Sequence, residues 1–267
     1  MPRPDASTTA VGAVATGAAQ ATARLAEAHE AASRGDYAAA LGTWMPLAQT
    51  GIARAQSNIG ACFANGLGVQ PDGALALRWL TLAAEAGDAI GQRNLATLYF
   101  KGEVVEANQT AAMRWYRAAA EQGDGDSQDM LSWLLVEGAL PTDYAEARRW
   151  ALAAAGQGIA ASMTRLGMLY HNALGVPRDP AGAAEWWRKA AMRGDADGQA
   201  MLGAAHYMGA GVSRDIVAAL AWLLRSQRAG SRLCLAFLPP VTAACNAAER
   251  EEAERCALVP LPPEERT

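Results

Sequence analysis

The sequence predicts an all-α protein that folds as a solenoid of antiparallel helix pairs, and three observations carry this prediction. Tryptophan recurs about every 36 residues, a period typical of stacked helical hairpins. An alanine stands three residues before each of these tryptophans, and a glycine stands eight residues after it. In the other half of each unit, small and apolar residues are spaced by three and four positions, which places them on one helix face. The tryptophan column consists of Trp79, Trp115, Trp150, Trp186 and Trp222.

The first 20 residues are predicted to form a disordered tail. Residues 10–19 contain no Leu, Ile or Phe, and this stretch is far shorter than the ~20 apolar residues that a membrane span needs. A signal peptide needs a basic start and a strongly apolar core, whereas here Arg3 is followed by Asp5 and then mostly by small residues. We therefore expect a cytoplasmic protein without a membrane span. The alternative is a periplasmic protein whose residues 1–23 are a cleaved export signal.

Six helical hairpins are predicted to follow the tail in one array, from residue 21 to residue 230. In five of them the first helix, called helix A from here on, has an apolar residue followed by a small one, with a tiny side chain four positions earlier. The most N-terminal hairpin follows the scheme less closely, because Trp44 stands one place off the tryptophan column. The hairpins are expected at residues 21–51, 53–87, 89–123, 125–158, 160–194 and 196–230.

The second helix of these five hairpins, helix B, has a predicted start and a predicted end. Seven residues before each tryptophan stands an Asp or Asn, whose side-chain oxygen accepts a free N–H group of the first helical turn. The glycine eight residues after the tryptophan takes the left-handed conformation that closes a helix. We expect the tryptophan to fill the groove between one hairpin and the next. The capping residues are Asp72, Asn108, Asp143, Asp179 and Asp215, and the closing glycines are Gly87, Gly123, Gly158, Gly194 and Gly230.

After the hairpins, residues 231–258 are predicted to form C-terminal capping helices, and residues 259–267 a flexible Pro-rich tail. Asn246 and Glu249 have the spacing of a capping box, which predicts the start of a helix that covers the last hairpin.

The four cysteines include no C-x-x-C pair, so neither a zinc framework nor one disulfide per hairpin fits their spacing. We interpret them as small buried hydrophobic residues. Whether any of the last three form a disulfide is left open by the sequence. The cysteines are Cys62, Cys234, Cys245 and Cys256.

Taken together, these columns resemble the Sel1-like repeat family, a relative of the tetratricopeptide repeat. The fullest matches run from Ser162 to Gly194 and from Ala55 to Gly87. The resemblance implies a right-handed superhelix that serves as a scaffold for protein–protein contacts. Some cysteine-rich members have been linked to β-lactam binding, but they resemble a pattern with a cysteine pair in each repeat, which this chain lacks. The loop at residues 103–105 lacks the usual glycine, and the loop at 139–141 is one residue shorter than its equivalents.

Signs of catalysis or of nucleic-acid binding are missing from the sequence. With 23 basic and 27 acidic residues, the net charge of -4 gives no basic surface for phosphate backbones. The two lysines, Lys101 and Lys189, do not lie three residues after a serine, so the S-x-x-K nucleophile motif is absent. The three histidines lie in three different hairpins, away from the cysteines, which disfavours a metal site. We therefore predict no enzyme activity, no catalytic residue, no cofactor, no metal and no nucleic-acid partner.

A surface for a protein or peptide partner is the better prospect, because a solenoid keeps an extended face formed by one helix of each pair. If helix A lines that face, its exposed positions include large apolar side chains, which are common anchors for partners. An alternative for Trp133 is that it turns inward to fill space left by Ser132. The candidate partner-binding residues are Arg93, Thr97, Phe100, Lys101, Asp129, Trp133, Glu137, Met168, His171, Asn172, Tyr207 and Met208.

The sequence therefore predicts a non-enzymatic interaction scaffold or adaptor whose concave helix A face binds a peptide or a protein. Two alternatives remain. One is a hydrolase or a β-lactam-binding activity on the same scaffold, which needs a nucleophile and a base close together. The other is a periplasmic regulator or envelope-assembly adaptor of the same fold.

Overall fold

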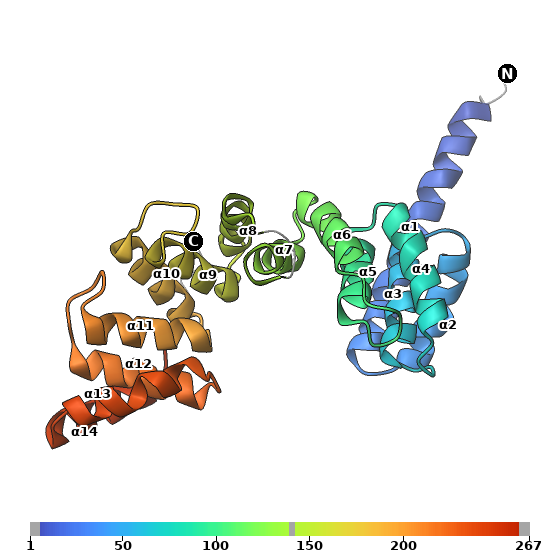
Figure 1. Ribbon diagram of the computed structural model, residues 1–267. Coiled ribbons are helices and arrows are strands. Elements are labelled where there is room, and N and C mark those ends of the chain that lie inside the picture. The colour runs from blue at the N-terminus through green and yellow to red at the C-terminus, as the bar shows by residue number, and fades with distance from the viewer. Residues whose placement is uncertain (1–5, 139–141, 262–267) are drawn as a thin grey trace. The chain divides into compact units, whose positions relative to one another are not determined.

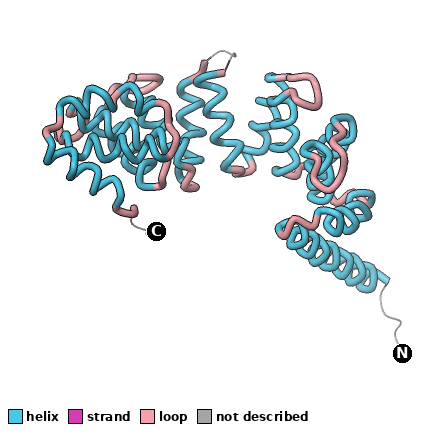
Figure 2. Tube along the Cα trace, turned by 90° about the horizontal axis from the view of Figure 1, so that it is seen from below, coloured by secondary structure: helices cyan, strands magenta, loops and turns pink. Residues whose placement is uncertain are grey.

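A computed structural model of the chain describes residues 6–138 and 142–261. Within these ranges the secondary structure is helical, without strands, and successive helices pack as antiparallel pairs (Figure 1). Short loops connect the helices (Figure 2). The all-α solenoid of helix pairs that the sequence predicts is confirmed. Contacts between Cα atoms divide the chain into two compact units, Met1–Asp124 and Gly125–Thr267, where the sequence predicts a single array.

The first unit holds three hairpins. Its first helix differs from expectation, because α1 already begins at Ala6, inside the segment predicted to be a disordered tail. The high helix propensity of alanine, which is frequent in this segment, is the physical reason. Residues 1–5 lie outside the described ranges. The helices of this unit are α1 (Ala6–Ser33), α2 (Tyr37–Gln49), α3 (Ala53–Asn65), α4 (Gly73–Glu85), α5 (Ala89–Lys101) and α6 (Gln109–Glu121).

The second unit holds three further hairpins and the C-terminal helices. The predicted short loop at residues 139–141 lies outside the described ranges, as does most of the predicted Pro-rich tail. The helices of this unit are α7 (Gly125–Glu137), α8 (Tyr144–Gly156), α9 (Ala160–His171), α10 (Pro180–Met192), α11 (Ala196–Met208), α12 (Ile216–Arg228), the 3-10 helix η1 (Leu233–Ala236), α13 (Leu238–Ala244) and α14 (Ala247–Leu258).

Capping side chains begin the helices where the sequence predicts. At all five predicted positions the carboxylate or amide oxygen accepts the backbone N–H three residues ahead. The five closing glycines have φ between 82° and 90°, a region that side chains with a Cβ rarely adopt. Sequence analysis missed the caps Asp88 and Asp195. They begin α5 and α11, which are both helices A, in the same way.

Four tryptophans of the column pack between successive hairpins of their own unit, as predicted. Trp79 packs against the core formed by α1, α2 and α3, and Trp115 packs against the core of α4 and α5. Trp186 and Trp222 contact the preceding helices in the same manner. A cation lies 4.5 to 5.9 Å from the centroid of each of the five rings. These cations belong to Arg78, Arg114, Arg149, Lys189 and Arg225.

In the five hairpins with the tryptophan column, the residue after the tryptophan is fully buried. Opposite it stands the small residue of helix A, and the fit is close. A Cβ atom added to Gly60 would lie 2.6 Å from Cγ of Leu80, and one added to Gly203 would lie 2.8 Å from Cγ of Leu223. The small residue of helix A thus makes room for the side chain from helix B. This buried column reads Leu80, Tyr116, Ala151, Trp187 and Leu223.

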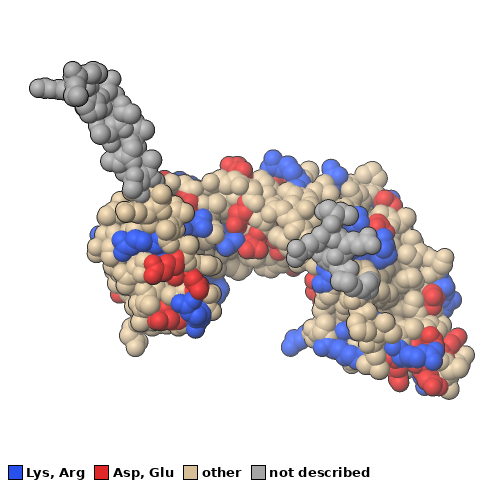
Figure 3. Space-filling model, turned by 180° about the vertical axis from the view of Figure 1, so that it is seen from behind, with Lys and Arg blue, Asp and Glu red and all other residues tan. Residues whose placement is uncertain are grey.

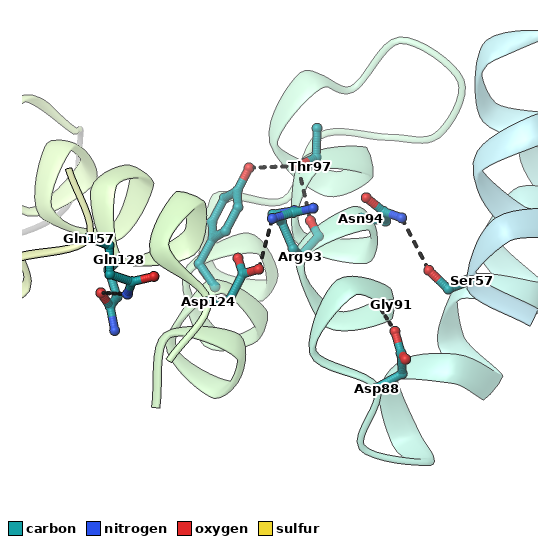
Figure 4. Close-up of polar contacts among 10 residues, drawn as sticks. Ser57, Asp88, Gly91, Arg93, Asn94, Thr97, Asp124, Gln128 and Gln157 are labelled. Carbon is teal, nitrogen blue, oxygen red and sulfur yellow. Dashed lines mark hydrogen bonds and ion pairs between the residues drawn. The ribbon is translucent and has the colours of Figure 1, made fainter. Parts of the chain in front are cut away.

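Buried glutamines, missed by sequence analysis, stand at the same position of four helices A, and three of them bond to the preceding helix. The side-chain amides of Gln56, Gln92 and Gln199 donate to backbone carbonyls eight residues earlier, at 3.1 to 3.3 Å. At the equivalent position in the second unit, Gln128 accepts a hydrogen bond from the side chain of Gln157 at 2.9 Å (Figure 4). The three carbonyls also accept a backbone N–H from the closing glycines Gly51, Gly87 and Gly194, so each glutamine adds a second hydrogen bond at the end of the preceding helix.

The C-terminal helices cover the last hairpin, as predicted. Val241, Cys245 and Ala253 share a core with residues of α12. The capping box of Asn246 and Glu249 begins α14. All four cysteines are free, and only Cys256 is not fully buried, which agrees with their interpretation as hydrophobic packing residues.

Candidate functional site

The candidate partner-binding residues fall into both units. In the first unit, four of them lie on helix α5. In the second unit, the other eight lie on helices α7 and α9, on α11, and at Asn172 just after α9.

In the first unit, a pocket of about 70 Å³ lies between helices α3 and α5. Two of the candidates, Thr97 and Lys101, line it. Its full lining is Ala61, Ala64, Asn65, Leu80, Asn94, Thr97, Leu98, Lys101, Glu103 and Val104. The two helices also bond directly, because the amide of Asn94 donates to the hydroxyl of Ser57 at 3.2 Å (Figure 4).

Two candidates of the first unit have structural roles. The guanidinium of Arg93 lies 2.8 Å from the carboxylate of Asp124, and the Thr97 hydroxyl lies 2.9 Å from that of Tyr116 (Figure 4). Burial raises the pKa of Tyr116, while the hydrogen bond to Thr97 and the charge of Arg93 act to lower it. Arg93 and Thr97 therefore join α5 to the end of its own hairpin. Phe100 is half-buried.

In the second unit, a pocket of about 200 Å³ brings together three of the candidates, Trp133, Glu137 and Met168. We call it the Trp133 pocket. Helix α7 supplies the first two, helix α9 supplies the third, and the start of α11 closes the pocket with two aspartates. Its full lining is Trp133, Glu137, Ala161, Thr164, Arg165, Met168, Asp195 and Asp197.

Trp133 faces this pocket and does not turn inward to the core, which was the alternative. Its ring is half-buried, and its indole N–H donates to the carboxylate of Glu137 at 3.1 Å. The neighbouring Ser132 is fully buried. Trp133 and Glu137 are four residues apart, so one helical turn places both on the same side of α7.

The walls of the Trp133 pocket are held by buried polar contacts between successive helices A. The guanidinium of Arg165 lies 2.7 Å from the carboxylate of Asp129, and the Thr164 hydroxyl donates to Asp195 at 2.6 Å. Arg165 is only 8% exposed and Thr164 only 6%. Asp129 also accepts from the hydroxyl of Ser162 at 2.5 Å, so this candidate has a structural role behind the pocket and does not line it.

The other candidates of the second unit are not among the residues that line the Trp133 pocket. The ring of His171 lies 5.3 Å from that of Trp187 and packs against it. Tyr207 is half-buried below the guanidinium of Arg214. Asn172 and Met208 are exposed, Met208 by 54%.

Sequence reasoning missed Arg165, Asp195 and Asp197 as residues of this site. A signal for Asp195 exists, because an aspartate also follows the closing glycine at Asp88 and Asp124. Both of those aspartates form an ion pair with the preceding helix A, so the repeated Gly-Asp pair marks a junction between hairpins.

The described ranges show neither a group of three metal-ligating side chains nor a helix with the length and apolarity to span a membrane. On the face drawn in Figure 3, basic and acidic side chains are interspersed among uncharged ones.

Comparisons with known proteins agree with this architecture. The Sel1 repeat model matches five consecutive segments, 53–88, 89–124, 125–159, 160–195 and 196–231. The crystal structure of a Sel1 repeat protein from Oxalobacter formigenes is similar, with 27% identity, 90% of this chain and 99% of that chain covered, and a TM-score of 0.78. That of c5321, a protective antigen of uropathogenic Escherichia coli with an SLR fold, covers 89% of this chain and 60% of that chain, at 25% identity and a TM-score of 0.58. No curated protein sequence matches the chain. With five matched repeats over most of its length, the chain belongs to the Sel1 repeat family.

Proposed function

We propose that this protein is a non-enzymatic scaffold that binds a peptide or protein partner on its helix A face, with the Trp133 pocket as the main anchoring point. Sel1 repeat proteins are typically interaction scaffolds. The observation that carries the proposal for this chain is the convergence of Trp133, Glu137 and Met168 from two successive helices A on one pocket.

The size of the pocket favours a side chain of a larger partner. Pockets for small-molecule ligands usually have volumes of about 300–1,000 Å³, whereas the Trp133 pocket has about 200 Å³. Trp and Met side chains are frequent anchors at protein interfaces, because they offer a large contact area without a charge to desolvate.

The side chains of the pocket also favour binding over the alternative of hydrolysis. Thr164 is the one hydroxyl among the lining residues, and it donates to Asp195, which at the same time caps helix α11. Among the residues that the structure describes, the lining contains no histidine, cysteine, serine or lysine. A nucleophile needs a base within hydrogen-bond reach and access to substrate, and Thr164 is only 6% exposed.

The test is selection from a displayed library of random short peptides on the immobilised full-length chain. Peptides should be enriched, and the double variant Trp133→Ala, Met168→Ala should lose them while keeping the helical circular dichroism signal. Leu258→Ala, which truncates an apolar side chain that is 71% exposed on α14, is the matched control and should bind normally. Failure to enrich any peptide, or unchanged binding by the double variant, overturns the proposal. Turnover of a panel of esters and β-lactams would instead support the hydrolase.

A further inference from the structure

We infer that the Trp133 pocket binds the side chain of a lysine or arginine in the partner, an inference that rests on the proposed function. The pocket combines an apolar surface, offered by Trp133 and Met168, with three carboxylates, those of Glu137, Asp195 and Asp197. A long basic side chain matches both parts, because its stem is apolar and its end is cationic.

The three carboxylates are paired with uncharged donors. Within the described ranges, Glu137 accepts from the indole of Trp133, and Asp197 accepts from the hydroxyl of Ser231 at 2.5 Å. Asp195 accepts from Thr164 and from the backbone N–H of Gly198, both at 2.6 Å. These contacts fix the carboxylates in position, and no ion pair with another described side chain compensates their negative charge.

The single guanidinium of the pocket wall does not cancel this charge. Arg165 lies 2.7 Å from the carboxylate of Asp129 and is mostly buried against it. That ion pair is neutral as a whole. The net charge offered to a ligand therefore comes from Glu137, Asp195 and Asp197.

A comparison with the first unit shows that the pocket lacks a cation found elsewhere in the chain. Arg93 stands two residues before the apolar residue of its helix A and pairs with Asp124 at 2.8 Å. Thr164 stands at the equivalent position in α9, and Asp195 is the equivalent of Asp124. The hydroxyl of Thr164 reaches the aspartate, as the arginine does in the first unit, but brings no positive charge. The place of that charge is open to a cation from a partner.

The ring of Trp133 adds a second attraction for a cation. Indole faces attract ammonium and guanidinium groups within about 6 Å of the ring centroid. The chain itself uses this contact, since Nζ of Lys189 lies 4.5 Å from the ring of Trp186. The pocket between α3 and α5, by contrast, has no tryptophan among its described lining residues and is lined by Lys101 as well as Glu103, so it lacks this preference.

The experiment uses the peptides selected on the full-length chain and measures their affinity by fluorescence anisotropy. We expect a lysine or arginine at one fixed position of the enriched peptides. Replacing it with the uncharged isostere norleucine should raise Kd by about tenfold, since a charge-assisted contact is lost. Glu137→Gln should raise Kd by about fivefold, and added salt should reduce the difference between wild type and variant. Glu251→Gln, at an exposed carboxylate of α14, is the control and should have no effect.

Thr164→Arg provides an independent arm, because it places at the pocket the cation that Arg93 supplies in the first unit. It should abolish binding of the basic peptides and keep the helical circular dichroism signal. Two outcomes overturn the inference but not the proposed function. In one, peptides without a basic residue are enriched and depend on Trp133 but not on Glu137. In the other, the enriched peptides carry an acidic residue at the fixed position. Failure to enrich any peptide overturns both.

Discussion

The fit between Gly167 and Trp187 gives the sharpest test of how the hairpins are packed. Gly167 lies on α9 and Trp187 on α10, and Trp187 is only 1% exposed. A Cβ atom at Gly167 would lie 2.2 Å from the indole nitrogen, 2.4 Å from Cδ1 and 2.8 Å from Cε2. Since such contacts are far below van der Waals distance, Gly167→Ala requires the whole indole to move.

The cost follows from three contributions. Overpacking a filled core costs about 1–3 kcal/mol. Movement of Trp187 breaks the 3.2 Å bond from its indole N–H to the carbonyl of Thr164, a loss of about 1 kcal/mol. Replacing glycine with alanine inside a helix returns about 1 kcal/mol. We therefore expect a net loss of about 1–3 kcal/mol in the free energy of unfolding, and a fall in Tm of about 3–10 °C.

The assay is urea and thermal unfolding followed by circular dichroism, with a double-mutant cycle. Trp187→Ala alone should cost about 3–5 kcal/mol, but in that background Gly167→Ala should cost nothing or stabilise, because the space is then free. The matched control is Gly156→Ala on α8, where an added Cβ meets nothing within 4 Å, and it should stabilise by about 0.5–1 kcal/mol. An equal cost of Gly167→Ala in both backgrounds would refute the packing argument.

Three further predictions concern a helix cap, an ion pair and a thiol. Asp179→Ala removes the oxygen that accepts the Gly182 N–H of α10 and should lower the free energy of unfolding by about 1 kcal/mol in urea titrations. Asp129→Asn leaves the buried Arg165 without its charge partner and should cost about 2–4 kcal/mol by the same measurement; a loss below 0.5 kcal/mol would contradict this role. Burial raises the pKa of Cys62 from 9.0 to about 11, so the unfolded chain loses this proton first and stability falls as pH rises from 9 to 11. Relative to Cys62→Ala, the wild type should lose up to about 2 kcal/mol across this interval, and parallel curves for the two proteins would speak against a buried thiol.

Much of the fold could be predicted from the sequence because its rules are local. The capping aspartate, the closing glycine and the spacing of three and four depend on residues within one hairpin. The repeated tryptophan did not predict which side chain of helix B is buried. Trp150 is buried, but Trp79 and the other tryptophans of the column are only half-buried, whereas the position after the tryptophan is fully buried in all five hairpins.

That neighbouring position escaped prediction because it varies from repeat to repeat. It holds Trp187 in one hairpin and Ala151 in another, and the opposing residue changes with it, from Gly167 to Ser132. The sizes of the two facing side chains are matched because helix A and helix B are in contact. The two residues of each pair are far apart in the sequence, so spacing rules within one helix do not predict the match. A comparison of both positions together across the repeats, in place of one column at a time, would have revealed the match in size.

The same reasoning explains how the candidate site was found only in part. Helical spacing placed Trp133, Glu137 and Met168 in register on helix A, but Asp195 comes from the turn before the following hairpin. Whether the charge of Asp195 is available to a ligand depends on the residue that it contacts, which is Thr164. The position two before the apolar residue of helix A holds Arg93 in α5, where it pairs with Asp124, and Thr164 in α9, where it reaches Asp195 without bringing a positive charge. The five repeats hold Ser57, Arg93, Asp129, Thr164 and Ala200 at this position, so stacking does not fix its charge, and spacing alone could not reveal the carboxylate at the pocket.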